Sequence, residues 1–137
     1  MSLNIKKVNY ENFQQMLEKK LLLVAGRDEI PDLVEDTFRL LRDGKAHLFL
    51  CPTGGAILEP VVDDDVASIN VVFGWNTNGR GILDYINIYE NLAHEIGATR
   101  IISFARREGV FRLWKRQGFY KVGYNEQGLI KFAKDLG

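Results

Sequence analysis

A passage from strand to glycine-rich loop to helix to strand lies in the middle of the chain and limits the folds that the chain can adopt. Residues 66–75 have the alternation of a strand and place five side chains on one predicted face: Ala67, Ile69, Val71, Phe73 and Trp75. The loop at 76–81 follows, then apolar residues at helical spacing over 82–96, which Gly97 ends. A second strand is predicted over 99–105. Such a β-α-β passage predicts two parallel strands joined by a right-handed crossover.

The flanking residues supply the remaining elements. Apolar alternation and turn residues predict five more strands, at 3–10, 46–51, 56–62, 119–124 and 129–133. Helical spacing and capping residues predict three more helices, at 11–21, 31–44 and 109–117. The resulting order, β-α-α-β-β-β-α-β-α-β-β, indicates one α/β domain over residues 1–137. Its sheet is expected to be mixed, largely antiparallel and flanked by helices.

The composition excludes several classes of protein. With 137 residues, 46% of them apolar and 26% charged, the chain is typical of a soluble globular domain that buries its own core. A single cysteine excludes an intramolecular disulfide, and with two histidines it does not favour a structural zinc site. No apolar run reaches the ~18 residues of a membrane span. The N-terminus lacks the apolar core of a signal peptide, so the cytoplasm is the expected compartment.

Charge is unevenly distributed although the net charge is zero. Residues 1–65 carry 8 basic and 12 acidic side chains, whereas residues 66–137 carry 10 and 6. The second half is therefore the better candidate for binding an anion. Nucleic acid is not a favoured partner, because the total charge is neutral and no recognised binding module is present.

Two glycines, Gly79 and Gly81, lie where the strand gives way to the helix. Glycine in such a loop allows positive φ and close approach of another group to the backbone. One interpretation is a tight turn. The other is an anion site, because the unpaired N–H groups and the positive dipole end of a helix N-terminus attract phosphate.

The element order and this loop together resemble the GNAT superfamily of acyl-CoA N-acyltransferases, as a divergent member. The family's acyl-CoA loop reads Q/R-x-x-G-x-G/A, and asparagine replaces the first residue here. The resemblance implies that loop N–H groups cradle the CoA pyrophosphate, from Asn76, Thr77, Asn78, Gly79, Arg80 and Gly81. Asp84, in the first helical turn, would repel that anion. The resemblance also implies a V-shaped opening between strands 66–75 and 99–105, where the pantetheine arm bonds to the backbone of Val71, Val72 and Phe73.

The family's catalytic motif is degenerate in this chain. Many relatives carry N-x-x-A-x-x-x-Y-x-x-x-G-F, in which the tyrosine protonates the departing CoA thiolate. The matching stretch, REGVFRLWKRQGF, has Trp114 at the tyrosine position. An indole N–H does not ionise usefully, so Trp114 cannot act as that acid. We expect it to pack on the sheet beside Val110 and Phe111.

No general base can be assigned. Residues 66–75 contain no acid, although Ser68 and Asn70 could hold a water. The nearest carboxylates are Glu59 and the acidic turn 63–65, which is either a solvated turn, a site for a hard cation or an attraction for a cationic acceptor. The catalytic residues are therefore unknown from sequence.

The other candidate side chains fit ordinary structural roles better. Seven basic residues form either a solvated face or a site for the 3′-phosphate end of CoA: Arg100, Arg106, Arg107, Arg112, Lys115, Arg116 and Lys121. His47 and His94 lie in no motif. Cys51 is expected to be a small buried apolar side chain rather than a nucleophile.

Two functions follow from the resemblance. In the first, the chain transfers an acyl group from acetyl-CoA or another acyl-CoA to a small-molecule or protein amine. In the second, it keeps the fold without the chemistry and serves as a binding or assembly protein, as small degenerate GNAT-like proteins of tailed phages do. A homodimer or a protein partner belongs to this second hypothesis. A fold alone does not choose between them.

Overall fold

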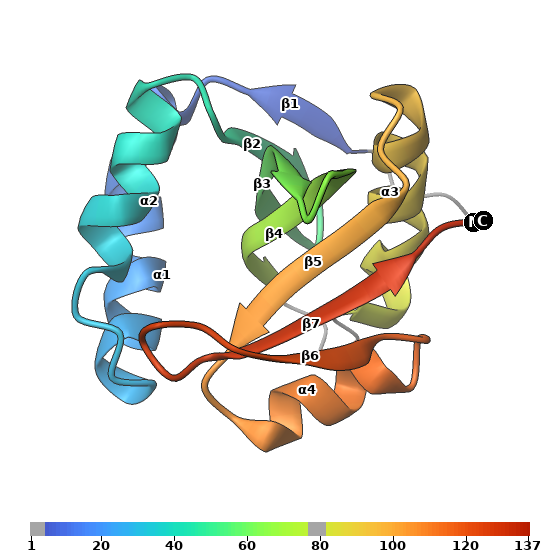
Figure 1. The fold of residues 1–137 in the computed structure, drawn as a ribbon. Helices are drawn as coiled ribbons and strands as arrows, with labels where there is room; N and C mark the ends of the chain where they lie inside the picture. Colours follow the sequence, from blue (N-terminus) through green and yellow to red (C-terminus); the bar gives the residue numbers. More distant parts are fainter. Residues whose placement is uncertain (1–4, 77–81) are drawn as a thin grey trace.

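The computed structural model describes residues 5–76 and 82–137, which contain a seven-stranded sheet of order β1-β2-β3-β4-β5-β7-β6 (Figure 1). Its strands are β1 (Lys6–Val8), β2 (His47–Cys51), β3 (Gly54–Asp63), β4 (Val66–Asn76), β5 (Arg100–Ala105), β6 (Tyr120–Tyr124) and β7 (Ile130–Asp135). Strands β4 and β5 are parallel, and the other neighbouring pairs are antiparallel. The predicted mixed, largely antiparallel sheet is confirmed.

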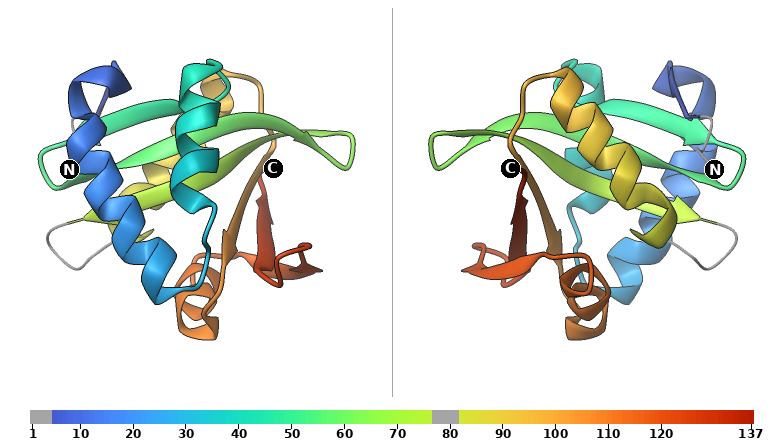
Figure 2. Two further views of the ribbon diagram at one scale, coloured as in Figure 1. Left: turned by 90° about the vertical axis from the view of Figure 1, so that its left-hand side faces the viewer. Right: turned by 90° about the vertical axis from the view of Figure 1, so that its right-hand side faces the viewer.

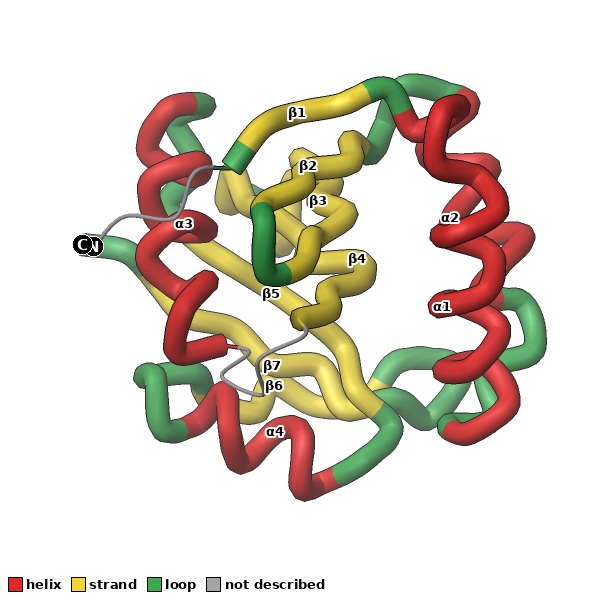
Figure 3. Tube along the Cα trace, turned by 180° about the vertical axis from the view of Figure 1, so that it is seen from behind, coloured by secondary structure: helices red, strands yellow, loops and turns green. Residues whose placement is uncertain are grey.

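Helices cover both faces of the sheet. They are α1 (Gln14–Arg27), α2 (Leu33–Arg42), α3 (Ile82–Glu95) and α4 (Glu108–Lys115), with a 3₁₀ turn at Tyr10–Phe13. Helices α1 and α2 lie side by side over one face, and α3 lies over the other (Figure 2). Figure 3 shows the same separation from behind, with α4 below α3. No helix in the described part of the chain is long and apolar enough to cross a membrane.

Each face of the sheet has its own apolar core. The larger core joins α3 and α4 to the sheet and includes Ile69, Val71, Tyr89, Ile101, Phe111 and Phe132. The smaller core joins α1 and α2 to the sheet and includes Leu17, Leu41, Leu48 and Ile57. The strands supply apolar side chains to both cores, because successive side chains of a strand point to opposite faces of the sheet.

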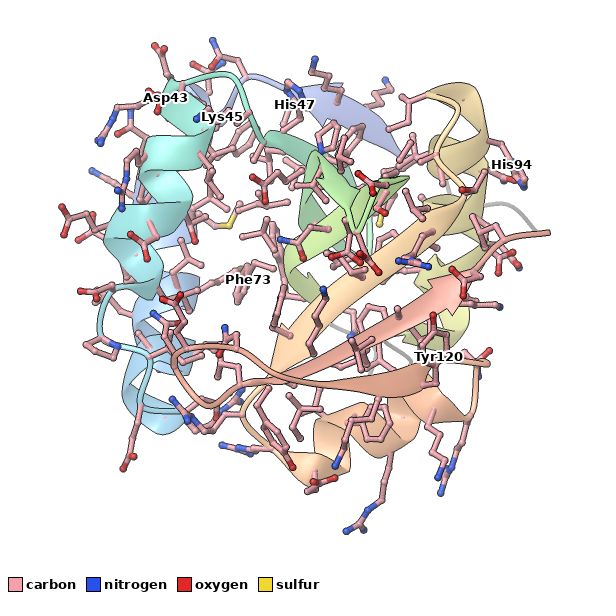
Figure 4. The ribbon with its side chains drawn as sticks, viewed as in Figure 1. Asp43, Lys45, His47, Phe73, His94 and Tyr120 are labelled. Carbon is pink, nitrogen blue, oxygen red and sulfur yellow. The ribbon has the colours of Figure 1, made fainter. Side chains whose placement is uncertain are left out.

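The predicted single apolar face of β4 is wrong beyond Val71. Opposite β4, the register shifts between Ile57 and Leu58, which pair with Phe73 and Val71. Val72 is therefore the extra residue of a β-bulge, and a bulge exchanges the faces of the residues after it. Val71 lies in the α3–α4 core, whereas the aromatic residues at the end of β4 pack in the α1–α2 core. Figure 4 shows Phe73 between β4 and these two helices.

Helix α1 starts later and continues further than the predicted 11–21. The 3₁₀ turn occupies the predicted start, and the helix extends to Arg27. The run of leucines after residue 20 breaks the helical spacing, because Leu22 and Leu23 point to solvent and Leu23 is 75% exposed. An apolar run without periodicity therefore concealed two further turns of helix.

Candidate functional site

The candidate site begins where β4 and β5 separate. The two strands pair only along Ser68–Val71 and Arg100–Ser103, although β4 continues to Asn76. At the last pair the Ser103 hydroxyl donates to the Val71 carbonyl oxygen at 2.8 Å. Beyond this point β5 and β7 turn away from β4 (Figure 2). The predicted parallel pair that parts at its C-terminal ends is confirmed.

A cavity of about 480 Å³ opens at this separation and reaches both faces of the sheet. Its walls come from α1 and α2 on one side, from α3 and α4 on the other, and from β4 between Asn70 and Asn76. Past Val71, β4 pairs with β3 along one edge, and on its other edge the described residues provide no strand partner. Backbone N–H and C=O groups along that free edge can therefore bond to an extended ligand.

The structure brings together four of the predicted CoA-binding residues. Val71, Val72, Phe73 and Asn76 all line the cavity. The other predicted residues, Thr77, Asn78, Gly79, Arg80 and Gly81, lie outside the described residues, as does the side chain of Asp84. Their role at the pyrophosphate stays a prediction.

Tyr89 places a hydroxyl group in this cavity. The residue is 3% exposed and lines the cavity, and no hydrogen-bond partner for its hydroxyl occurs within the described ranges. Gly74 on the free part of β4 adjoins it, since a Cβ there would lie 3.2 Å from the hydroxyl oxygen. Burial, helped by nearby Tyr85, raises the pKa of the Tyr89 phenol. Tyr89 therefore stays neutral and offers a hydrogen-bond donor.

Trp114 supports Tyr89 from α4. Its ring is stacked on the Tyr89 ring, with centroids 6.1 Å apart and planes 5° apart. It also contacts Phe119 at 4.9 Å and Phe132 at 5.2 Å between centroids. The predicted packing role of Trp114 is confirmed, and Phe111 and Val110 pack in the same core.

Three buried side-chain oxygens lack a hydrogen-bond partner in the part of the chain that the structure describes, and all three residues line this cavity. They are Thr37 Oγ1, Asn70 Oδ1 and Asn76 Oδ1. The Asn70 side chain uses its Nδ2 to donate to Glu59 Oε1 at 3.1 Å. An unsatisfied buried polar group costs about 1–3 kcal/mol. A bound water or a ligand with hydrogen-bond donors can supply the missing partners.

An ionic cluster joins the α1–α2 connection to the β5–α4 connection beside the cavity. Asp28, 8% exposed, pairs with Arg27 at 3.1 Å and Arg107 at 2.8 Å. Arg106 donates to the Asp28 and Glu29 carbonyl oxygens at 3.0 and 3.2 Å. Burial raises the pKa of the Asp28 carboxyl, but the two arginines outweigh it and hold that pKa below its usual value.

Cys51 differs from its predicted role as a buried apolar side chain. It is half-buried, and its Sγ lies 3.2 Å from the Tyr85 hydroxyl and 3.5 Å from Thr53 Oγ1. Burial raises the pKa of the thiol, while hydrogen bonds from the Thr53 and Tyr85 side chains and from the backbone of Thr53 and Gly54 together lower it by more and leave it below its usual value. The cysteine is part of a polar cluster at the β2–β3 turn.

Asp63, the first residue of the acidic turn, has a structural role. Asp63 accepts from Lys131 at 2.5 Å and Arg100 at 3.2 Å, which ties the β3–β4 hairpin to β7 and β5. Asp64 and Asp65 adopt positive φ in the tight turn. Among residues 5–76 and 82–137, no three metal-ligating side chains come together.

The basic cluster is divided among different roles. Arg100, Arg106 and Arg107 make the interactions described above with residues of other elements. Lys121 pairs with Glu108 at 3.1 Å. These residues hold elements together and do not form one anion site. His47 and His94 lie at different edges of the molecule, away from Phe73 (Figure 4).

Sequence reasoning missed Tyr89 and Thr37 as candidate site residues. Tyr89 counted as one of the apolar positions of its helix, and Thr37 was assigned no role. A hydroxyl-bearing residue on the buried stripe of each helix was the available signal, because such groups need a partner when buried. The signal does not by itself distinguish a structural partner from a ligand.

Comparison with solved structures identifies the fold. The chain superposes on a GNAT-family acetyltransferase from Staphylococcus aureus Mu50 with a TM-score of 0.68 and 12% identity, covering 99% of this chain and 100% of that one. An acetyltransferase from Thermus thermophilus gives 0.66 and 17%, covering 99% and 98%. The PaiA N-acetyltransferase of Thermoplasma acidophilum, solved with coenzyme A, gives 0.65 and 12%, covering 98% and 99%.

The chain therefore has the GNAT fold, and the resemblance found in the sequence is confirmed at that level. No protein-family model matches it, and no curated protein sequence matches it. At identities of 10–17% the likeness concerns the arrangement of elements and not the chemistry of the site.

Proposed function

We propose that this protein is an acyl-CoA-dependent N-acyltransferase. The observation that carries the proposal is the separation of β4 from β5 beyond Val71, with a cavity that crosses the sheet at that point. The pantetheine arm is an extended chain with two amides, and the free edge of β4 offers backbone groups that pair with amides. The coenzyme A bound to a protein of the same fold supports this assignment.

The residues of this chain would hold the acyl donor and acceptor on opposite faces of the sheet. The backbone from Val71 to Phe73 bonds the pantetheine, and the predicted loop at 76–81 bonds the pyrophosphate. The acceptor enters from the α1–α2 side, where Thr37 and Asn70 face the cavity. Bringing the two substrates together in one cavity supplies the orientation on which the reaction rate depends.

Tyr89 would assist the leaving group in place of the absent family tyrosine. As the amine nitrogen bonds to the acyl carbon, the C–S bond breaks and its electron pair goes to sulfur. The neutral Tyr89 hydroxyl donates a hydrogen bond to that thiolate, which a preorganised donor in a buried cavity stabilises. The amine gives its proton to water.

The test combines binding with turnover. Calorimetric titration with CoA should show one saturable site, and a melting curve should shift upward, because a ligand at 100 times Kd adds about 2.7 kcal/mol of apparent stability. Acetyl-CoA with an amine should then release free thiol and form an amide. Absence of CoA binding at millimolar concentration would contradict the proposal.

A non-catalytic role is the second candidate, and Trp114 is the observation that favours it. The family's acid is replaced there by a residue that packs against three aromatic rings. CoA binding without transfer to any amine in a broad panel would support this second function.

A further inference from the structure

The acceptor side of the cavity has a distinctive combination of apolar walls and unpaired oxygens. Its apolar surface comes from α1, α2, their connection and the end of β4: Val24, Ile30, Leu33, Leu40 and Phe73. Thr37 and Asn70 also line it, and Thr37 Oγ1 and Asn70 Oδ1 have no hydrogen-bond partner among the described residues. Thr37 is 1% exposed, so solvent does not satisfy its hydroxyl.

The Asn70 amide is oriented by its neighbour across the strands. Glu59 on β3 is the register partner of Asn70, and its carboxylate accepts from the amide nitrogen at 3.1 Å. The amide oxygen is thereby left as the free atom, and a carboxylate behind the amide nitrogen increases the negative charge on that oxygen. Both unpaired atoms accept hydrogen bonds, which is what an amine nitrogen with its N–H groups requires.

The two carboxylates in the cavity wall, Asp28 and Asp36, are already paired with arginines. Asp28 is neutralised by Arg27 and Arg107. Asp36, the other carboxylate in the cavity wall, pairs with Arg39. Within the described ranges the wall therefore offers no unpaired carboxylate that could bind a second cationic group of the acceptor.

We infer that the acceptor is a small primary amine with an apolar body, whose nitrogen bonds to Asn70 Oδ1 and Thr37 Oγ1. This inference rests on the proposed acyltransferase function. The apolar body displaces water from the α1–α2 walls, which supplies the binding free energy. A polyamine or an aminoglycoside would have to bury further ammonium groups without carboxylate partners, which is unfavourable.

The first experiment compares two amines at saturating acetyl-CoA. 2-Phenylethylamine has one amine on an apolar body, whereas spermidine carries three amines on a flexible chain. We expect thiol release with 2-phenylethylamine at a kcat/KM at least about tenfold higher than with spermidine, because burying even one further ammonium group without a carboxylate partner costs more than a tenfold change in affinity represents. Calorimetry of each amine with the CoA-bound protein gives a second readout that does not depend on turnover.

The second experiment removes the Thr37 hydroxyl in Thr37→Val. The apparent KM for 2-phenylethylamine should rise about tenfold while the affinity for CoA is unchanged. The melting temperature should not fall, because the variant removes a buried hydroxyl that has no partner among the described residues. A hydroxyl with a purely structural role would lower it.

Ser68→Ala is the matched control. The Ser68 hydroxyl is equally buried but donates to the Val66 carbonyl oxygen at 2.8 Å, and its residue does not line the cavity. Its loss should lower the melting temperature and leave the KM for the amine unchanged.

The outcomes distinguish a wrong acceptor assignment from a wrong acyltransferase assignment. Preference for spermidine, or an unchanged amine KM in Thr37→Val, would overturn the acceptor assignment and leave the acyltransferase function standing. A parent protein that does not bind CoA would overturn both.

Discussion

At the scale of single residues, Tyr89 links the packing of the molecule to its proposed chemistry. Its ring is held by stacking on Trp114, and the absence of a side chain at Gly74 lets its hydroxyl approach β4. A fixed ring whose hydroxyl is available to a ligand is a preorganised donor. The position one helical turn earlier, Tyr85, instead uses its hydroxyl to contact Cys51 and Thr53.

Tyr89→Phe tests this role because it removes one oxygen and keeps the stacked ring. We expect kcat for acetyl transfer to fall by about 10²-fold, as for the loss of one preorganised donor. The KM for acetyl-CoA and the melting temperature should change little. Steady-state kinetics and thermal unfolding measure all three.

Tyr85→Phe serves as the comparison on the same helix. It removes a hydroxyl that contacts other side chains, so its main expected effect is a lower melting temperature, by the loss of hydrogen bonds worth about 1 kcal/mol. Equal loss of kcat in both variants would contradict a specific role for Tyr89.

Residue-scale features of the site were only partly predictable. Trp114 was recognised because the family motif fixes its spacing, whereas the loop glycines, identified in the same way, lie outside the described residues and stay a prediction. Asn70 was identified together with Ser68, because both are polar and alternate with the apolar residues of the strand. Its link to Glu59 depends on a cross-strand register that a local pattern does not contain.

At the scale of elements, the end of β4 determines the site. The bulge at Val72 turns the last aromatic residues toward α1 and α2, and β5 departs from the same point. The order and type of the elements followed from periodicity and turn residues. The bulge did not, because one extra residue in a strand leaves no compositional mark when it is a valine like its neighbours.

The connection between α1 and α2 is held near the cavity by the Asp28 cluster. The pKa of Asp28 is lower in the folded protein than in the unfolded chain, so its contribution to stability is full above the unfolded value near 3.8. It is lost as pH falls through the folded pKa. Asp28→Asn should therefore be less stable than the parent at neutral pH, by about 1–2 kcal/mol.

Thermal unfolding of both proteins from pH 7 to pH 2.5 checks this expectation. The difference in melting temperature should stay constant down to about pH 4 and then shrink. Glu126→Gln changes an exposed residue in the β6–β7 turn, and its melting temperature should equal that of the parent at every pH. A difference between Asp28→Asn and the parent that grows on acidification would contradict the assignment.

At the scale of the whole molecule, the cavity exists because the sheet is covered on both faces and opened in the middle. The helices α1 and α2 close one side, and α3 and α4 close the other (Figure 2). The parallel crossover and the antiparallel hairpins were predictable from the chain. The position of β7 between β5 and β6 was not, because strand order depends on long-range pairing rather than on local sequence.

Amide NMR of CoA binding tests directly whether the ligand site lies where β4 and β5 separate. Titration with CoA should shift the amide signals of residues 72–76 and of Tyr89, with one dissociation constant for all of them. The amides of Arg112 and Lys115, two basic residues of α4, should not show the largest shifts, because the cavity lies at the separation of β4 and β5. No shifts at millimolar CoA, or shifts confined to α4, would contradict the account.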